Sequence, residues 1–131
     1  MNTGVAFLVV AAGGALGACC RYAASLWLVG ERFSIPFATL SVNLAGCFMA
    51  GLLYALIAQR AVPAGYLALL LITGFLGALT TFSTFSVETL TLFLAERPWA
   101  ALANALVNLV GSLAAVAAGF LLLAGRIPHA A

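Results

Sequence analysis

The sequence contains very little charge. Of its 131 residues, 6% are charged, and these are five Arg and three Glu, without any Lys or Asp. Soluble domains use about a quarter charged residues, so this chain could not cover a water-facing surface. The scarcity of charge excludes a soluble enzyme and an appended cytosolic domain. Five scattered Arg do not form the basic patch that nucleic acid requires, and we therefore expect no nucleic-acid partner.

Cysteine is also scarce. Cys19, Cys20 and Cys47 lack the spacing of a metal site or of a disulfide scaffold, and we expect them to be small buried apolar residues. The stretch Leu16-Gly17-Ala18-Cys19 has the form of a lipoprotein cleavage site. However, residues 1–18 contain none of the Lys or Arg with which a signal peptide starts. The cleaved-signal interpretation is therefore disfavoured.

Apolar residues make up most of the chain. They account for 66% of the sequence, and the mean hydropathy is +1.23. Short polar clusters divide the chain into four runs, each long enough to cross ~30 Å of hydrocarbon as a helix, the default conformation in lipid. We predict an all-α membrane protein in which residues 1–131 form a single four-helix transmembrane domain, with spans at about 4–28, 37–58, 66–94 and 99–124.

The arginines give no preferred orientation in the bilayer. If Arg21 lies within the membrane, Arg32 and Arg97 fall on one side and Arg60 and Arg126 on the other. The positive-inside rule then makes no choice, which favours dual topology and pairing with an inverted copy. The alternative is that the nascent N-terminus or a lipid preference decides the orientation and the tie is accidental.

Small residues four positions apart provide contacts for close helix association. Gly13 and Gly17 form one such pair, and Gly111, Ala115 and Gly119 form a longer series. Ordinary packing within one subunit explains part of this pattern. Four helices fill their interior with side chains and can hardly enclose a conduit alone, so a homo-oligomer is expected.

Polar side chains inside apolar spans are costly and are therefore candidates for function. The last span carries Asn104, Asn108 and Ser112 at intervals of four, which places them on one face of a helix. The second span carries Thr39, Ser41 and Asn43. Interhelical hydrogen bonding is the structural alternative, but this number of amides and hydroxyls favours a polar track lined with donors.

The third span contains a run of poor helix formers. Two glycines, Gly74 and Gly77, precede a segment of Thr, Ser and Phe at 80–86. We predict a helix broken near the membrane centre, which would release carbonyls suited to Na⁺. The positive edges of Phe82 and Phe85 could face an anion. The alternative is a kinked helix rich in Ser and Thr, with aromatic rings that only pack.

Three motifs resemble the CrcB/Fluc family of fluoride channels. The match follows the first three spans in order, and the last span resembles the family in its polar and small-residue pattern. The motifs are Gly14-x-x-Gly17-Ala18-x-x-Arg21-Tyr22, Asn43-x-x-Gly46 and Gly74-Phe75-x-Gly77-x-x-Thr80-Thr81-Phe82-Ser83-Thr84-Phe85-Ser86.

The resemblance implies a passive, fluoride-selective channel of the bacterial inner membrane that lets fluoride leave the cytoplasm and so lowers its toxicity. It also implies an antiparallel, dual-topology homodimer with two pores at the subunit interface. A structural Na⁺ would lie on the two-fold axis, held by the backbone carbonyls of Gly77 and Thr80.

By motif, Phe82 and Phe85 match the anion-coordinating phenylalanines of the family, and Asn43 matches its pore-lining asparagine. With the neighbouring hydroxyls, the candidate fluoride pore comprises Asn43, Thr81, Phe82, Ser83, Thr84, Phe85 and Ser112. Arg21 either draws anions into a vestibule or acts structurally. Glu88 is interpreted as a structural acid, in preference to a gating or interfacial one.

Two other functions compete with the channel. A small multidrug-type, proton-coupled exporter is also short and four-helical, but it needs an acid in its first span, where this chain has Arg21 and no acid. A non-conducting membrane assembly subunit is supported only by the lack of a catalytic constellation. No Ser/His or Asp pair that could serve an intramembrane enzyme is present, and we expect no enzymatic activity.

Overall fold

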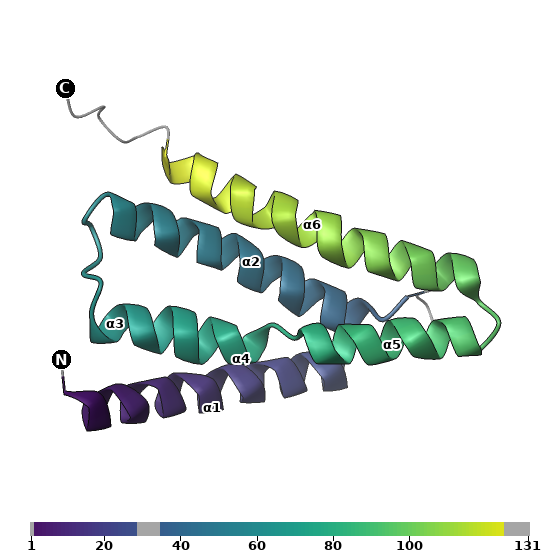
Figure 1. Cartoon of the computed structure of the whole chain (residues 1–131), viewed down its shortest axis with the longest axis horizontal. Helices are drawn as coiled ribbons and strands as arrows, with labels where there is room; N and C mark the ends of the chain where they lie inside the picture. Colours follow the sequence, from purple (N-terminus) through teal and green to yellow (C-terminus); the bar gives the residue numbers. More distant parts are fainter. Residues whose placement is uncertain (1, 29–34, 125–131) are drawn as a thin grey trace.

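The computed structural model describes residues 2–28 and 35–124, and within them the chain is helical without strands. Helices α1 and α2 form the first two long elements, the third is assembled from several shorter pieces, and α6 is the last (Figure 1). The bounds are α1 Thr3–Trp27, α2 Phe37–Ala58, α3 Tyr66–Ala68, η1 Leu69–Leu76, α4 Gly77–Leu79, α5 Phe82–Leu94 and α6 Pro98–Ala124.

Four helical stretches are long and apolar enough to cross a membrane. They are 3–27, 37–58, 66–94 and 98–124, and each begins and ends within one residue of a predicted span. The all-helical architecture with four candidate membrane spans is therefore confirmed. Because the number of spans is even, α1 begins and α6 ends at the same end of the bundle (Figure 1).

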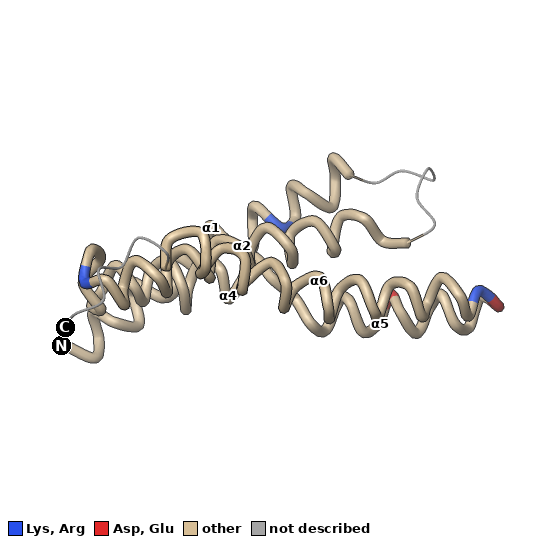
Figure 2. Tube along the Cα trace, turned by 90° about the horizontal axis from the view of Figure 1, so that it is seen from above, with Lys and Arg blue, Asp and Glu red and all other residues tan. Residues whose placement is uncertain are grey.

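The charged residues in the described part of the chain lie mostly at the ends of the bundle (Figure 2). Arg60 follows α2, and Glu96 and Arg97 follow α5. Arg21 and Glu88 are the exceptions, because they lie inside α1 and α5. Two of the arginines counted for the orientation of the chain, Arg32 and Arg126, lie outside the described residues.

The long helices pack in pairs, α2 on α6 and α1 on the segment formed by η1 and α4 (Figure 1). Glycine permits both contacts. A Cβ atom on Gly17 would overlap the carbonyl oxygen of Phe75, and one on Gly119 would overlap the carbonyl oxygen of Phe48. The glycine pattern of the sequence thus serves close helix packing within this chain.

The third span changes its helical geometry twice. Leu69–Leu76 is a π-helix, an element that is rare beyond a single turn. The helical path then stops at Leu79, because Thr80 has an extended backbone with ψ 152° and Thr81 has φ −149° and ψ 118°. Helix α5 begins at Phe82, and the Thr81 hydroxyl accepts a hydrogen bond from the Thr84 N–H as its N-cap.

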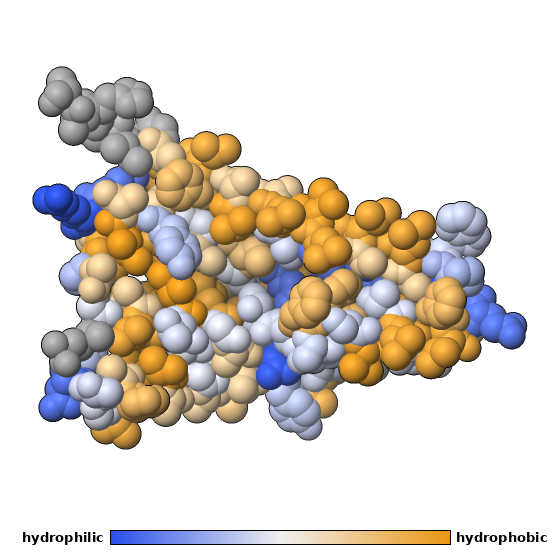
Figure 3. Space-filling model, viewed as in Figure 1, coloured by the Kyte–Doolittle hydropathy of each residue, from blue (hydrophilic) through white to orange (hydrophobic). Residues whose placement is uncertain are grey.

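Apolar side chains cover most of the surface. Figure 3 shows hydrophobic residues over the face that is viewed, with hydrophilic residues at the ends and near the middle of the bundle. Cys19 and Cys20 belong to the exposed surface, so the expectation that all three cysteines are buried was wrong. Before Arg21, helix α1 is apolar on every side, and the composition of this part therefore does not reveal which face points outward.

Candidate functional site

Asn43 joins α2 to the extended residues of the third span. Its Oδ1 accepts a hydrogen bond from the Thr81 N–H at 2.8 Å, and its Nδ2 donates to the Thr81 carbonyl at 3.3 Å. A residue between two helices has backbone groups without a helical partner. The buried amide of Asn43 supplies such a partner and thereby stabilises the backbone at Thr81.

Further amides extend this contact into α6. Asn43 Nδ2 also donates to Asn108 Oδ1 at 3.0 Å. Asn108 Nδ2 donates to both the backbone carbonyl and the Oδ1 of Asn104, and Asn104 Nδ2 donates to the Thr89 hydroxyl at 2.8 Å. Asn104 is fully buried and Asn108 is 3% exposed. Two residues of the predicted polar face of the last span, Asn104 and Asn108, therefore belong to a hydrogen-bonded network in the interior of the chain.

Two phenylalanines lie beside this network. The rings of Phe82 and Phe85 meet edge to face, with centroids 5.3 Å apart and an angle of 61° between the ring planes. Phe85 is buried, whereas Phe82 is 71% exposed on the surface of the chain. An edge-to-face pair leaves ring hydrogens, which carry positive potential, at its margin.

One cavity brings most of the predicted pore residues together. It has a volume of about 300 Å³ and is here called the Asn43 cavity. Its lining comes from α2, the extended residues, α5 and α6, and comprises Asn43, Cys47, Thr80, Thr81, Phe82, Phe85, Asn108, Leu109, Ser112 and Leu113. Apolar surface predominates, so the few donors in it act in surroundings poor in water.

The other predicted hydroxyls lie on the far side of Thr81. The Thr81 Oγ1 is 3.2 Å from the Ser83 Oγ and donates to the Thr84 Oγ1 at 3.0 Å. Thr84 lines a second, larger cleft of about 560 Å³, here called the Arg21 cleft, and Thr81 borders both spaces. Ser83 is exposed and is part of neither lining. Thr81 therefore separates the two spaces.

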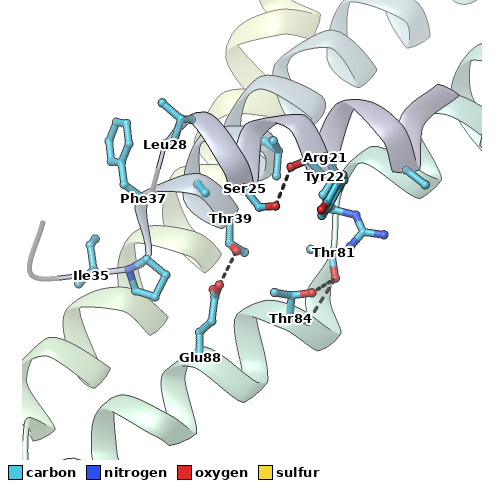
Figure 4. Close-up of a pocket in the computed structure, with 14 residues that line it drawn as sticks. Arg21, Tyr22, Ser25, Leu28, Ile35, Phe37, Thr39, Thr81, Thr84 and Glu88 are labelled. Carbon is cyan, nitrogen blue, oxygen red and sulfur yellow. Dashed lines mark hydrogen bonds between the residues drawn. The ribbon is translucent and has the colours of Figure 1, made fainter. Parts of the chain in front are cut away.

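The Arg21 cleft contains both charged residues of the spans (Figure 4). Arg21 Nε donates to the Ala78 carbonyl at 3.0 Å, in the last turn before the extended residues. The Thr39 hydroxyl donates to Glu88 Oε1 at 2.7 Å, and the two side chains face one another across the cleft. Within the described part of the chain, the buried Glu88 Oε2 accepts no hydrogen bond. Arg21 thus binds one of the main-chain carbonyls at the C-terminal end of α4.

Gly77 and Thr80 occupy this same helix end. Thr80 donates from its N–H and from its hydroxyl to the Leu76 carbonyl, both at 3.0 Å. Gly77 is exposed, and a Cβ on it would meet only the Ile72 carbonyl, at 3.6 Å. Carbonyl oxygens at the C-terminal end of a helix carry partial negative charge and suit a hard cation. The residues present therefore fit a cation held by main-chain oxygens.

Two features of the site were not predicted from the sequence. Cys47, expected only to be a small buried apolar residue, lines the Asn43 cavity, and Thr39, a candidate for the polar track, is the partner of Glu88. Cys47 lies one helical turn after Asn43, and this spacing could have indicated its position. No local pattern identifies the pairing of Thr39 with Glu88, because the two residues are 49 positions apart.

Comparison with known proteins finds a family match and relatives that are named as ion channels. The model of the family described as CrcB-like protein, Camphor Resistance (CrcB), matches residues 8–120. A protein named fluoride-specific ion channel FluC from Bordetella petrii is 47% identical over 113 residues, which are 86% of this chain and 87% of that protein. Proteins of the same name from Saccharophagus degradans and Salinibacter ruber are 40% and 46% identical and cover 90% and 86% of this chain, and 89% and 84% of their own lengths.

These relatives are named as ion channels, a class of protein that is not enzymatic. Together with the four apolar helices, they identify the chain as a multi-pass protein of the bacterial inner membrane. The family match covers most of the chain, including Asn43 and the extended residues of the third span. The resemblance seen in the sequence motifs is confirmed, and the chain belongs to the CrcB family.

Proposed function

We propose that this protein is a passive channel that lets fluoride leave the cytoplasm. The observation that carries the proposal is the Asn43 cavity, in which a buried amide, the Thr81 backbone and an edge-to-face phenylalanine pair meet. Fluoride is small and strongly hydrated, so it can enter an apolar passage only where donors replace its water. The names of the relatives support fluoride as the ion.

The hydrogen bonds of Asn43 indicate how a donor becomes available. Its 3.3 Å bond to the Thr81 carbonyl is the longest of the three in which its amide takes part, and an N–H···O bond weakens with distance. Fluoride would take the place of that carbonyl, with the Ser112 hydroxyl and the phenylalanine edges as further weak partners. Several weak partners allow an ion to leave as well as to enter.

An antiparallel, dual-topology homodimer is part of this proposal. Phe82 is 71% exposed on a single subunit, and one wall of the Asn43 cavity is therefore open. A second copy would close the passage, and the equal sharing of arginines between the two sides favours an inverted copy. Cysteines placed in the loops of a variant that lacks native cysteine should be labelled from both sides of the membrane. Labelling from one side alone would contradict the inverted pair.

We further propose a structural Na⁺ between the two subunits, with the carbonyls of Gly77 and Thr80 as its ligands. The exposed position of Gly77 at a helix end supports this assignment. A bound cation would supply positive potential near the passage. The residues of this chain supply the oxygens, and Arg21 already engages the neighbouring Ala78 carbonyl.

Fluoride efflux from proteoliposomes tests the proposed function. Liposomes loaded with KF should release fluoride rapidly once valinomycin lets K⁺ follow, and only slowly before, because an uncoupled anion flux builds up a voltage. An ion-selective electrode records the release. Liposomes loaded with KCl serve as the control and should release little chloride. Comparable chloride release, or no fluoride release from folded protein, would remove the assignment.

The phenylalanine pair gives a second prediction. Phe82→Ile and Phe85→Ile should each slow fluoride efflux by about tenfold, because an aromatic contact is worth up to ~1.5 kcal/mol, while the protein still assembles. Phe93→Ile is the matched control, since Phe93 is an exposed phenylalanine of the same helix outside the Asn43 cavity. If both cavity variants conducted like the control, the rings would have no part in passage.

A further inference from the structure

The amide of Asn108 has both of its N–H groups occupied by one residue. Asn108 Nδ2 lies 3.1 Å from the backbone oxygen of Asn104 and 3.0 Å from its Oδ1. Its own Oδ1 is consequently turned toward Asn43, whose Nδ2 donates to it at 3.0 Å. The buried Asn108 amide thus presents an acceptor, and no donor, to the Asn43 side chain.

Two main-chain groups fix the direction of this chain of hydrogen bonds. The Thr81 N–H can only donate, and the backbone carbonyl of Asn104 can only accept. Between them stand the amides of Asn43 and Asn108, each with one oxygen and one NH₂. If either amide were turned over, two acceptors or two donors would face one another along this chain of hydrogen bonds. Only one combination of orientations of the two amides therefore pairs every donor with an acceptor.

This fixed orientation matters most for the Asn43 amide when an anion is bound in the cavity. Fluoride at the Asn43 cavity displaces the long bond from Asn43 to the Thr81 carbonyl, which leaves that amide held at Thr81 by its oxygen alone. The terminal torsion of an asparagine is broad and turns easily. A half-turn would present the amide oxygen to the anion and repel it. A second fixed bond is needed to keep the donor in place.

We infer that Asn108 is a positioning residue, which acts through Asn43 and keeps one N–H of that amide directed into the cavity while fluoride passes. The inference rests on the proposed function, because it assigns fluoride to the Asn43 amide. Asn108 itself gives no hydrogen to the anion, since Asn104 engages both of its N–H groups.

The variant Asn108→Leu tests this role at nearly constant volume. Its fluoride efflux should be about threefold to tenfold slower than that of the wild type, the range expected for one buried hydrogen bond between membrane helices. In protein labelled with ¹⁵N-asparagine, the N–H signals of the wild-type Asn43 side chain should shift when NaF is added and should remain one narrow pair. In Asn108→Leu the same signals should shift and broaden with NaF.

Thr91→Val is the control, because the Thr91 hydroxyl bonds only within α5, to the Val87 carbonyl, outside the amide network. It should leave both the efflux and the Asn43 signals unchanged. Asn108→Ser, whose side chain is too short to reach Asn43, should behave like Asn108→Leu and serves if the leucine variant does not assemble.

The two readouts separate failure of the inference from failure of the proposed function. If folded Asn108 variants conducted at the wild-type rate and the Asn43 signals stayed narrow with NaF, the positioning role would be overturned while the channel remained. If wild-type protein released no fluoride and its Asn43 signals did not respond to NaF, the proposed function itself would fall.

Discussion

Gly17→Ala should prevent the protein from accumulating in a folded form. A Cβ at this position would overlap the Phe75 carbonyl oxygen and lie 3.0 Å from the Leu79 nitrogen. Both are main-chain atoms of the third span, so no side chain can rotate to make room. Overpacking costs about 3 kcal/mol or more when the backbone must move, a large part of the stability of an ordinary domain.

The same helix supplies the control. Gly14 belongs to the same sequence motif, yet a Cβ on it would meet no atom within 4 Å in the subunit. Gly14→Ala should therefore keep a symmetric size-exclusion peak and a thermal unfolding temperature close to that of the wild type, whereas Gly17→Ala should lose both. Equal behaviour of the two variants would show that α1 does not pack on the third span as described.

Asn43→Asp should abolish fluoride passage while the fold survives. The Asp side chain can still accept a hydrogen bond from the Thr81 N–H. In either protonation state, however, it lacks the NH₂ group with which Asn43 donates to both Asn108 and the Thr81 carbonyl. When ionised it also repels the anion, by about 4 kcal/mol for two charges ~4 Å apart at an effective dielectric constant of ~20. We expect efflux to fall by about 100-fold or more.

Asn2→Asp makes the same chemical change far from the cavity. Asn2 is the N-cap of α1, a position that Asp also fills well, and its variant should conduct like the wild type. Both variants are compared with the wild type by the rate of fluoride efflux from KF-loaded proteoliposomes, normalised to the amount of folded protein. Normal conduction by Asn43→Asp would show that the amide donors are not used.

The spans and the composition of the site could be predicted because both depend on local sequence. Long apolar runs fix the helix ranges, and the interval of four between Asn104 and Asn108 places them on one face. The run of Thr, Ser and Phe after Gly77 indicated where regular helix would be difficult to maintain. These signals need no knowledge of a partner helix.

Partners across the fold could not be predicted in this way. The π-helix at Leu69–Leu76 has an ordinary apolar sequence that does not predict this geometry. Its backbone packs closely against the glycines of α1. Likewise, nothing in the sequence around Arg21 indicates that its side chain would donate to the Ala78 carbonyl, 57 positions away. Such contacts depend on how each helix is rotated about its axis, and a helix that is apolar on nearly all sides carries little information about that rotation.

The shared end of α1 and α6 limits how two copies could be encoded by a single gene. A short linker from the last helix of one copy to the first helix of the next starts and finishes on the same side of the bilayer. Such a tandem fusion would give both halves the same orientation. An inverted pair in one polypeptide would need one additional membrane crossing between the halves.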